Sequence, residues 1–383
     1  MDIIVAKRAL LGLLEKTHGV ADKKSAMPAL ANVLLTATHG TTGRLTVGAT
    51  DLYLSVTGSC ACECGDELAA GSVAVPAKDL LERVKAMADG PVQILVNAEA
   101  KMTVKSVGNK RRFDLSGIPG SEFPQLPKPT DGAPVIEIPV ATFALLIRET
   151  HFSVSTDETR PNVNSLLFEA QGSTVRAVST DGHRLSKAEA TIEGLDARAT
   201  MLIPLKAVLE LRRLADSAKA DKEALTVKIT HSGPNAFFDL AGMTFSVKLV
   251  DAQFPPYQQV IPAKSDHAVT VPRLALRDTL KAVSLAASDK TGGVKLTLAT
   301  GVLRVTSESA DSGQGFDELT VDFSGPEVVI GFNAKYILDV LDAIEPDEVV
   351  LGVSGELDPM TIKPSAETDA TSFVGVVMPI RIA

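Results

Sequence analysis

The chain repeats one pattern three times along its 383 residues. An aliphatic residue followed by proline recurs at Val75-Pro76, Ile138-Pro139, Ile203-Pro204 and Val271-Pro272. Each pair precedes an apolar pattern of helical period, and proline suits the first turn of a helix because the N–H that it lacks would have no partner there. Two further segments, VAKRALLGLLEK and NAKYILDVLDAI, keep the period without the proline. The pattern predicts six helices in three pairs, separated by alternating, strand-like runs.

Proline-rich segments divide this pattern into three units of similar length. PKPTDGAP (127–134) and PAKSDHA (262–268) each follow a Phe-Pro sequence, and both have the composition of linkers. We therefore predict domains at 1–127, 128–257 and 258–383. Units of about 128 residues are too long for solenoid repeats. They predict an α+β fold of three similar domains, each with two helices packed on antiparallel sheets.

Composition limits the kind of protein. Apolar residues make up 45% of the chain but aromatic residues only 4%, with no tryptophan, so the core must be aliphatic. The sequence holds no apolar run of about 18 residues, which argues against a transmembrane helix. The charged start MDIIVAKRAL does not resemble a signal peptide. These features predict a soluble, cytoplasmic protein.

Three cysteines, Cys60, Cys62 and Cys64, alternate along the segment GSCACECG. Alternation at period two places them on one face of a strand. Neighbouring positions of one strand are poor disulfide partners, and three thiols lack the fourth ligand of a structural zinc site. We expect reduced thiols here, with a metal or redox role as the alternative.

The segment STDGHRLSK (179–187) has the residue types of a catalytic loop. Aligned on the repeat, however, Thr50-Asp51, Thr180-Asp181 and Ser307-Glu308 coincide, so a hydroxyl followed by an acid recurs in all three copies. A feature of every copy is expected to build the fold, which predicts that Asp181 is a turn residue. Only the middle copy continues with Gly-His-Arg-Leu (182–185). That part is the candidate for a specific function, with an ordinary hairpin tip as the alternative.

Charge is distributed unevenly between the helices and the rest of the chain. The six predicted helical segments, 4–20, 76–88, 138–152, 204–220, 271–290 and 331–345, together carry +5, whereas the remaining residues carry −14, for a total of −9. The simplest explanation is a solvated helical face. If the helices of several domains lined one surface, they would hold a polyanion without reading its bases. Six domains, each about 36 Å wide, would enclose a hole that admits a nucleic-acid duplex.

Four segments carry a resemblance to a known family: RPNVNSLLFEAQGSTVRAVSTDGHRLS, DAQFPPYQQVIP, GFNAKYILDVLDAI and the ending VVMPIRI. Together they resemble the bacterial DNA polymerase III beta subunit, the DNA sliding clamp. The resemblance implies a head-to-tail ring of two identical chains around double-stranded DNA, independent of sequence. It also implies a non-catalytic processivity factor without cofactors or metal, at work in the cytoplasm near the nucleoid.

The implied partners are the DNA polymerase III catalytic subunit, the clamp-loader complex, and other DNA polymerases and repair proteins that carry short clamp-binding motifs; no membrane is implied. The resemblance places a peptide groove at Arg160, Val163, Thr180, Gly182, His183, Arg184, Leu185, Pro255, Val260, Asn333, Tyr336, Val376, Val377, Met378, Pro379, Ile380 and Arg381. It also implies DNA-facing residues Lys24, Lys78 and Lys206, and a dimer interface with Phe113 and Leu115 on one side and Leu285 and Ala286 on the other. The family often has an aromatic residue at Asn162 and a basic one at Gln259.

Two other interpretations stay open from the residues alone. The first is an enzyme, a hydrolase that uses Asp181 and His183 as an acid–base pair; no nucleophile motif and no phosphate-binding G-x-x-x-x-G-K-[ST] loop accompanies them. The second is a monomeric scaffold that binds peptides but does not encircle DNA.

Overall fold

The computed structural model describes residues 1–21, 25–39, 43–64, 70–219, 226–288, 292–310, 312–366 and 371–381. It divides into two compact units. Unit 1 comprises Met1–Val140 and Arg213–Leu249, and unit 2 comprises Ala141–Arg212 and Val250–Ala383. The longest helix, α4 (Leu205–Lys219), contributes residues to both units. None of the helices in these ranges is long and apolar enough to cross a membrane.

Unit 1 is built on one antiparallel sheet that branches at β4. Its long path runs β10-β15-β16-β17-β4-β1-β6-β7-β8, while β3 also pairs with β4, and β2, β5 and β9 continue from β3. The strands are β1 (Asp2–Ala6), β2 (Asn32–Thr38), β3 (Gly43–Thr50), β4 (Leu54–Cys64), β5 (Gly71–Pro76), β6 (Pro91–Val96), β7 (Lys101–Ser106), β8 (Arg112–Ser116), β9 (Ile118–Pro119), β10 (Val135–Pro139), β15 (Thr226–Ser232), β16 (Asn235–Leu240) and β17 (Met243–Lys248).

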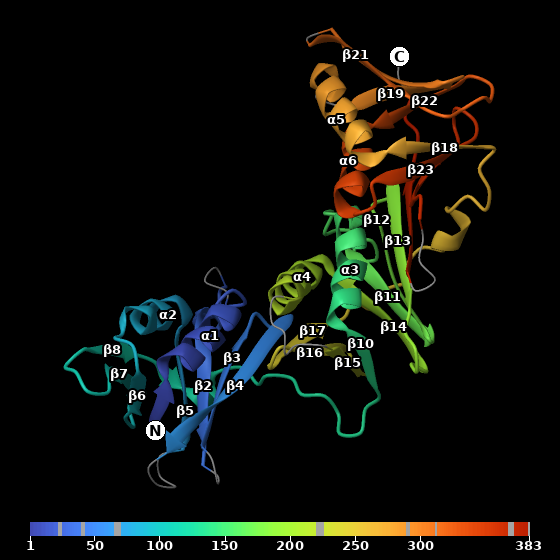
Figure 1. The fold of residues 1–383 in the computed structure, drawn as a ribbon. Coiled ribbons are helices and arrows are strands. Elements are labelled where there is room, and N and C mark those ends of the chain that lie inside the picture. Colours follow the sequence, from blue (N-terminus) through green and yellow to red (C-terminus); the bar gives the residue numbers. More distant parts are fainter. Residues whose placement is uncertain are drawn as a thin grey trace. The chain divides into compact units, whose positions relative to one another are not determined.

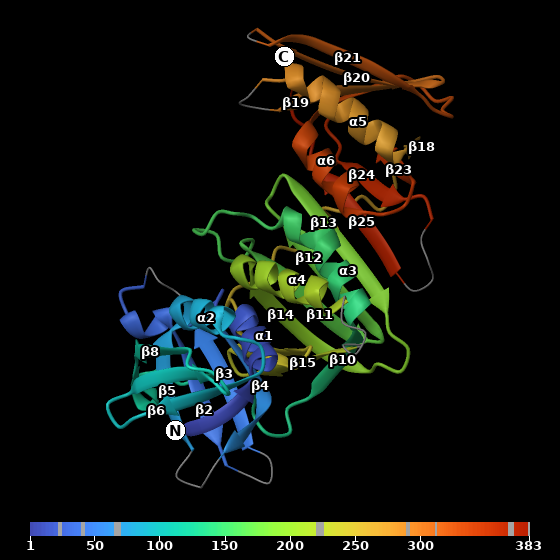
Figure 2. The same cartoon turned by 60° about the vertical axis from the view of Figure 1, so that its left-hand side comes forward.

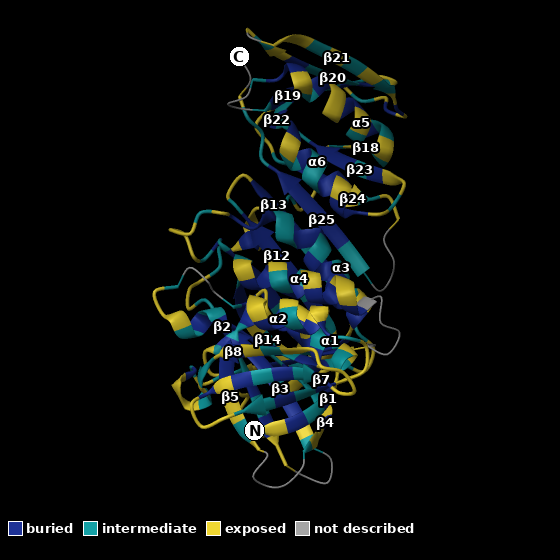
Figure 3. Cartoon of the chain, turned by 90° about the vertical axis from the view of Figure 1, so that its left-hand side faces the viewer, coloured by how far each residue is buried: buried dark blue, intermediate teal, exposed yellow. Residues whose placement is uncertain are grey.

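Two helices of unit 1, α1 (Lys7–Thr17) and α2 (Ala77–Ala86), lie side by side (Figure 1 and Figure 2). Each buries the apolar side that its period predicts: Leu10 and Leu14 from α1, and Leu80 and Val84 from α2, are fully buried. In Figure 3, exposed and buried residues alternate along the helices, as expected for helices that cover a sheet on one side only.

Unit 2 holds two antiparallel sheets, with the orders β14-β11-β12-β13-β25-β24-β23-β18 and β21-β20-β19-β22. The strands are β11 (Ser165–Gly172), β12 (Thr174–Thr180), β13 (Arg184–Thr191), β14 (Ala197–Pro204), β18 (His267–Pro272), β19 (Gly293–Ala299), β20 (Val302–Ser309), β21 (Gly313–Thr320), β22 (Val328–Asn333), β23 (Glu348–Val353), β24 (Met360–Pro364) and β25 (Thr371–Val377). The helices are α3 (Val140–Thr150), the first part of α4, α5 (Arg273–Val283) and α6 (Ala334–Ala343).

The α+β fold predicted from the sequence is confirmed, and so are the six helices at the predicted places. The prolines lie one position before the first helical turn that the sequence predicted for them. Pro76 and Pro272 end strands β5 and β18, and the helix begins at the following residue in each case. Proline suits this position because a strand end and a helix start both tolerate the missing N–H. In the last copy Asn333 takes the same position, and its side chain accepts a hydrogen bond from the Lys335 backbone N–H at 2.9 Å.

Both large sheets continue across the boundaries predicted between domains. In unit 1, β17 pairs with β4, with Phe245 opposite Val56. In unit 2, β13 pairs with β25, with Leu185 opposite Val376. Backbone hydrogen bonds therefore join the middle predicted domain to each of its neighbours.

Candidate functional site

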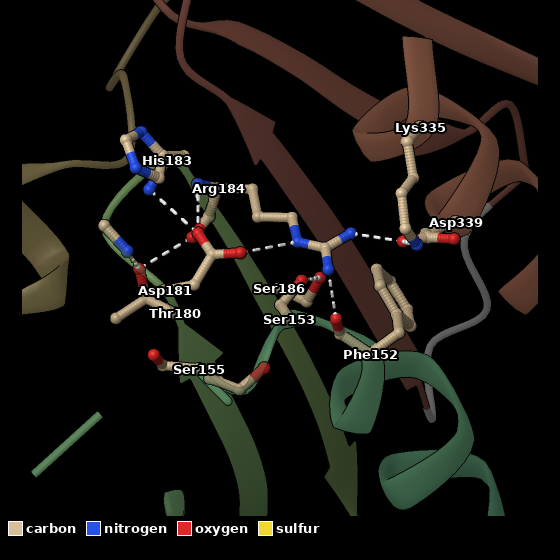
Figure 4. A network of polar contacts seen from close by, with 12 residues as sticks. Phe152, Ser153, Ser155, Thr180, Asp181, His183, Arg184, Ser186, Lys335 and Asp339 are labelled. Atoms are coloured by element: carbon tan, nitrogen blue, oxygen red, sulfur yellow. Dashed lines mark hydrogen bonds and ion pairs between the residues drawn. The ribbon is translucent and has the colours of Figure 1, made fainter. Parts of the chain in front are cut away.

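The segment Thr180–Leu185 forms the tight turn between β12 and β13, and its polar side chains bond to the turn itself (Figure 4). The Asp181 carboxylate accepts hydrogen bonds from the backbone N–H groups of His183, at 2.8 Å, and Arg184, at 3.1 Å. The Thr180 hydroxyl donates to the Arg184 carbonyl at 2.6 Å and accepts from the Gly182 N–H at 3.1 Å. Gly182 has φ +93°, a conformation that favours glycine. The prediction that Asp181 is a turn residue is confirmed.

The first copy of the repeat builds the same turn in unit 1. There Asp51 accepts from the N–H groups of Tyr53, at 2.9 Å, and Leu54, at 2.6 Å, and the Thr50 hydroxyl donates to the Leu54 carbonyl at 2.8 Å. Leu52 stands at the glycine position with φ +76°. The next hydrogen bond is repeated as well: Lys248 N–H donates to the Tyr53 carbonyl as Met378 N–H donates to the His183 carbonyl. The hydroxyl–acid pair therefore belongs to the fold in these two copies.

The third copy departs from the alignment made on the sequence, which was wrong there by one residue. Glu308 lies within β20, opposite Gln314, and not in a turn. Ser307 donates to the carbonyl of Val283, the last residue of α5, as Ser179 donates to the carbonyl of Thr150, the last residue of α3. Ser307 is thus the counterpart of Ser179. A one-residue shift moves a side chain to the other face of its strand, so the apolar alternation of Leu303 and Val305 was the sequence signal for the observed register.

Arg184 is the most heavily bonded residue of the site. Its side chain is 8% exposed, and its guanidinium donates to Asp181 at 3.0 Å, to Asp339 of α6 at 2.6 Å and to the carbonyl of Phe152. The guanidinium also lies 4.7 Å from the centre of the Tyr336 ring, a cation–π contact. These hydrogen bonds, ion pairs and ring contact surround the guanidinium and hold it in one position. Arg184 thereby joins β13 to α6 within unit 2.

His183 is exposed and its ring stacks on Tyr336, with 6.2 Å between ring centres and 14° between planes. The Tyr336 hydroxyl has a raised pKa, because burial disfavours the charged form and the Asp181 carboxylate adds to this effect. Both oxygens of the Asp181 carboxylate are engaged with N–H groups of the turn and of Arg184. The arrangement is that of a braced turn, which does not support the acid–base pair considered from the sequence.

Beside the turn, unit 2 contains a cavity of about 330 Å³. Its floor is apolar: Leu185 and Val376, paired across β13 and β25, are 1% and 0% exposed, and Tyr257 is 5% exposed. These residues belong to one packed cluster with Leu167, Val178, Leu202 and Val374. The Tyr257 hydroxyl donates a hydrogen bond to the Glu169 carboxylate at 2.9 Å, and the Tyr257 ring packs in the apolar cluster. Apolar walls with a few polar groups at the edge are typical of binding cavities.

Most residues that the resemblance placed in a groove do line this cavity: Arg160, Val163, Thr180, Gly182, Arg184, Leu185, Pro255, Val260, Val376 and Met378. The remaining ones lie elsewhere within unit 2. Val377 is fully buried opposite Arg184, Ile380 donates its N–H to the Gly331 carbonyl, and Arg381 is exposed. Asn333 caps α6, and His183 and Tyr336 stack beside the turn; Pro379 is half-buried.

Asn162, noted from the sequence as a departure from the family, lines the cavity as well, whereas Tyr257 is a lining residue that sequence reasoning missed. Tyr257 had a signal, because it follows Phe254-Pro255-Pro256 at the place where Leu126 follows Phe123-Pro124 in the first copy. Leu126 packs against Gly48, where an added Cβ would lie 2.4 Å from a Leu126 methyl group. A large apolar side chain after the Phe-Pro sequence thus fills the same place in both copies.

A second cavity in unit 2, of about 450 Å³, has both charged and apolar residues in its lining and lies at the end of α3. Arg148 and Glu149 line it together with Glu345, and Arg148 forms ion pairs with Glu345 and, at 3.9 Å, with Glu149. The Glu149 side chain is only 10% exposed. Burial raises the pKa of its carboxyl group to about 7, with Arg148 acting against this effect and Glu345 adding to it.

The residues predicted to face DNA are only partly described. Lys24 lies outside the described residues. Lys78, on α2, is exposed and lies 3.7 Å from Glu82, and Lys206, on α4, is exposed.

Of the four residues predicted for a dimer interface, Leu285 is 83% exposed, Phe113 is half-buried, and Leu115 and Ala286 are buried within their own units. Phe316, a further large apolar side chain, is 64% exposed on β21.

Family models cover nearly the whole chain. Residues 1–127 match the N-terminal domain of the DNA polymerase III beta subunit, residues 137–256 its central domain and residues 258–381 its C-terminal domain. The beta sliding clamp of Vibrio cholerae is 30% identical over 384 residues, and that of Pseudomonas putida 32% identical over 385, with both chains covered completely.

Solved structures agree with these matches. The DNA polymerase III subunit beta of Pseudomonas aeruginosa superposes with a TM-score of 0.90 at 29% identity and full coverage of both chains. A structure of that clamp bound to griselimycin gives a TM-score of 0.89 at 30% identity, again over the whole of both chains.

These matches define the class as the DNA sliding clamps, which are processivity factors and not catalysts. The chain belongs to the DNA polymerase III beta-subunit family.

Proposed function

We propose that the chain works as a sliding clamp whose apolar cavity in unit 2 holds short peptide motifs of its partners. Such motifs would come from the DNA polymerase III catalytic subunit, the clamp loader, and other polymerases and repair proteins. The observation that carries this proposal is the cavity itself. Its apolar floor adjoins the segment Gly182–Leu185, the part of the turn whose sequence is found only in the middle copy.

The chemistry of the cavity favours an aliphatic or aromatic side chain of an extended peptide. Leu185, Tyr257 and Val376 form a rigid floor, since each is held by strand pairing or a packed cluster. Met378, with its flexible thioether, and the partly exposed Val260 border the opening and can adjust to different ligands.

The experiment that tests the groove is peptide binding to two matched variants. Val260→Glu places a charge at the rim, and we expect it to weaken binding of a clamp-binding peptide by about tenfold or more, equal to about 1.4 kcal/mol. Val329→Glu is the control, since Val329 is similarly exposed (39% against 41%) and does not line the cavity. Equal loss in both variants, or no loss in Val260→Glu, would remove the cavity as the peptide site.

We also propose that two chains close head to tail into a ring. Two sheet edges support this proposal: β8 ends the long sheet path of unit 1, and β21 ends the four-stranded sheet of unit 2. Edge strands with unpaired backbone groups and exposed apolar side chains tend to pair with another chain. Leu285 and Phe316 provide those side chains beside β21.

Sedimentation at low concentration tests the ring. Phe316→Asp is expected to shift the species toward the mass of a single chain, 40.2 kDa. Leu357→Asp is the matched control, because Leu357 is 66% exposed and Phe316 is 64% exposed. A wild-type protein that sediments as one chain would favour the monomeric scaffold instead.

The mode of DNA binding that we propose is encirclement, with basic helices facing the duplex. The exposed positions of Lys78 and Lys206 are compatible with weak phosphate contacts that do not read sequence. Retention on circular DNA, followed by release when the DNA is linearised, is the expected result. Strong preference for one DNA sequence, or retention that survives linearisation, would contradict it.

We propose three domains with boundaries at 127/128 and 257/258, and a cytoplasmic location at the nucleoid, where the DNA partner is found. The three family-model ranges support the domain boundaries.

A further inference from the structure

Two of the three cysteines on β4 stand close together on one face of the strand. The Sγ atoms of Cys62 and Cys64 are 3.7 Å apart, and the thiols are free. The Cys64 thiol also points to the carbonyl of Thr38 at 3.9 Å. Alternation along the strand thus produces a pair of sulfur atoms fixed by the backbone of a single element.

Gly43 pairs with Cys62 across β3 and β4 and packs against the two sulfur atoms; an added Cβ would also lie 2.7 Å from the Cys62 carbonyl oxygen. A Cβ at Gly43 would lie 2.6 Å from the Cys64 Sγ and 3.3 Å from the Cys62 Sγ. Gly43 is not among the residues with positive φ, so its backbone conformation does not require glycine. A side chain at this position would cover the sulfur pair.

The distance between the sulfur atoms matches a metal chelate. Two thiolates on a tetrahedral Zn²⁺ ion, each bonded at about 2.3 Å, stand about 3.8 Å apart. A disulfide needs a sulfur–sulfur distance of about 2.05 Å, so the two thiols are not bonded; at 3.7 Å they form a thiol–thiol contact whose length also fits a chelate. Cys62 is 8% exposed and Cys64 is half-buried, so an ion can enter from the Cys64 side.

We infer that Cys62 and Cys64 form a two-thiol binding site for a thiophilic divalent cation such as Zn²⁺ or Cd²⁺. Binding replaces the two S–H protons with two metal–sulfur bonds and releases both protons to solvent, with no change of oxidation state. In the described part of the chain, no group of three or more His, Cys, Asp or Glu side chains is placed to hold one metal ion. Water molecules or a small solution ligand therefore complete the coordination of the ion.

Burial, followed by the hydrogen bond with Cys64, raises the pKa of Cys62 to about 12, and burial also raises the pKa of Cys60. A protonated thiol is a poor nucleophile. A thiophilic cation can still displace the protons, because two metal–thiolate bonds form at once.

The test is a titration of the full-length, reduced protein with Cd²⁺, with the thiolate-to-metal absorption as the readout. We expect one Cd²⁺ per chain, release of two protons, and competition by Zn²⁺. Cys62→Ser and Cys64→Ser are each expected to weaken Cd²⁺ binding by more than about tenfold, because a single thiolate cannot chelate the ion. Cys60→Ser, on the same strand, is the matched control and is expected to bind as the wild type does.

Circular dichroism and thermal unfolding establish that all three variants are folded. In a second readout, bound Cd²⁺ is expected to slow alkylation of Cys64 in the wild type and in Cys60→Ser. An unchanged absorption in Cys62→Ser or Cys64→Ser would overturn the inference. So would an equal loss in Cys60→Ser, or a folded wild-type protein that gives no thiolate absorption with Cd²⁺.

Discussion

Replacing Glu149 with glutamine is expected to stabilise the protein in a way that depends on pH. The carboxyl group is 10% exposed at the end of α3 and has a pKa of about 7 in the folded state, against 4.5 as the usual value. A raised pKa in an acid means that the folded state favours the protonated form. Folding is therefore penalised as pH rises from about 4.5 to about 7, and the penalty is constant above that range.

The magnitude follows from the pKa difference. Each pKa unit corresponds to about 1.4 kcal/mol, so the full penalty at pH 8.5 is about 3 kcal/mol, whereas at pH 5 it is below about 1 kcal/mol. Glutamine keeps the size and polarity of the side chain but carries no charge. The stability difference between Glu149→Gln and the wild type should thus grow by about 2–3 kcal/mol between these two pH values.

Urea unfolding of both proteins at pH 5 and pH 8.5 measures this difference. Comparing the variant with the wild type at each pH cancels titrations that the two proteins share. A carbon-13 titration of Glu149 gives the folded-state pKa directly. A stability difference that is the same at both pH values, or a Glu149 pKa near its ordinary value, would show that the reasoning from burial is wrong.

Three further changes test other contacts. Leu52→Gly replaces a leucine that adopts a left-handed backbone conformation in an exposed turn. Relief of backbone strain should exceed the entropic cost of glycine, so urea unfolding should show the free energy of unfolding raised by about 0.5–1 kcal/mol. A lower free energy of unfolding would contradict this account. Asp339→Asn leaves the buried Arg184 one charged partner short and should cost about 1–2 kcal/mol, with a double-mutant cycle against Arg184→Met giving the coupling. Tyr257→Phe removes the hydrogen bond to Glu169 and should cost about 1 kcal/mol, while equal stability would mean that water replaces the hydroxyl.

The helices and the turn were predictable because their signals are local. An apolar period of 3.6 residues specifies which side of α2 or α5 is buried, whatever lies against it. The Thr-Asp turn was predictable for a similar reason, since its hydrogen bonds close within Thr180–Arg184 and need no partner from elsewhere. Because the same turn recurs at Thr50–Leu54, the Thr-Asp pair could be assigned to the fold and not to a function of the middle copy.

What the sequence did not reveal depends on residues far apart along the chain. The ion pair between Arg184 and Asp339 joins positions that only the tertiary fold brings together, so no periodic pattern in the sequence predicts it. Phe316 was missed because β21 alternates without an apolar side, so one exposed phenylalanine among polar neighbours has no pattern. The one-residue error at Ser307 arose because the copies were aligned on the hydroxyl–acid pair and not on the buried face of β20, which Leu303 and Val305 mark.

The pairing of β17 with β4, and of β13 with β25, has a mechanical consequence. A force that separates the strands at either pairing must break several backbone hydrogen bonds. In the ring that we propose, the joint between separate chains would carry no covalent connection and would depend on side chains such as Leu285 and Phe316. A hoop made from two such chains would therefore part at its seams, where it can be reclosed, and would leave the folded interior of each chain undamaged.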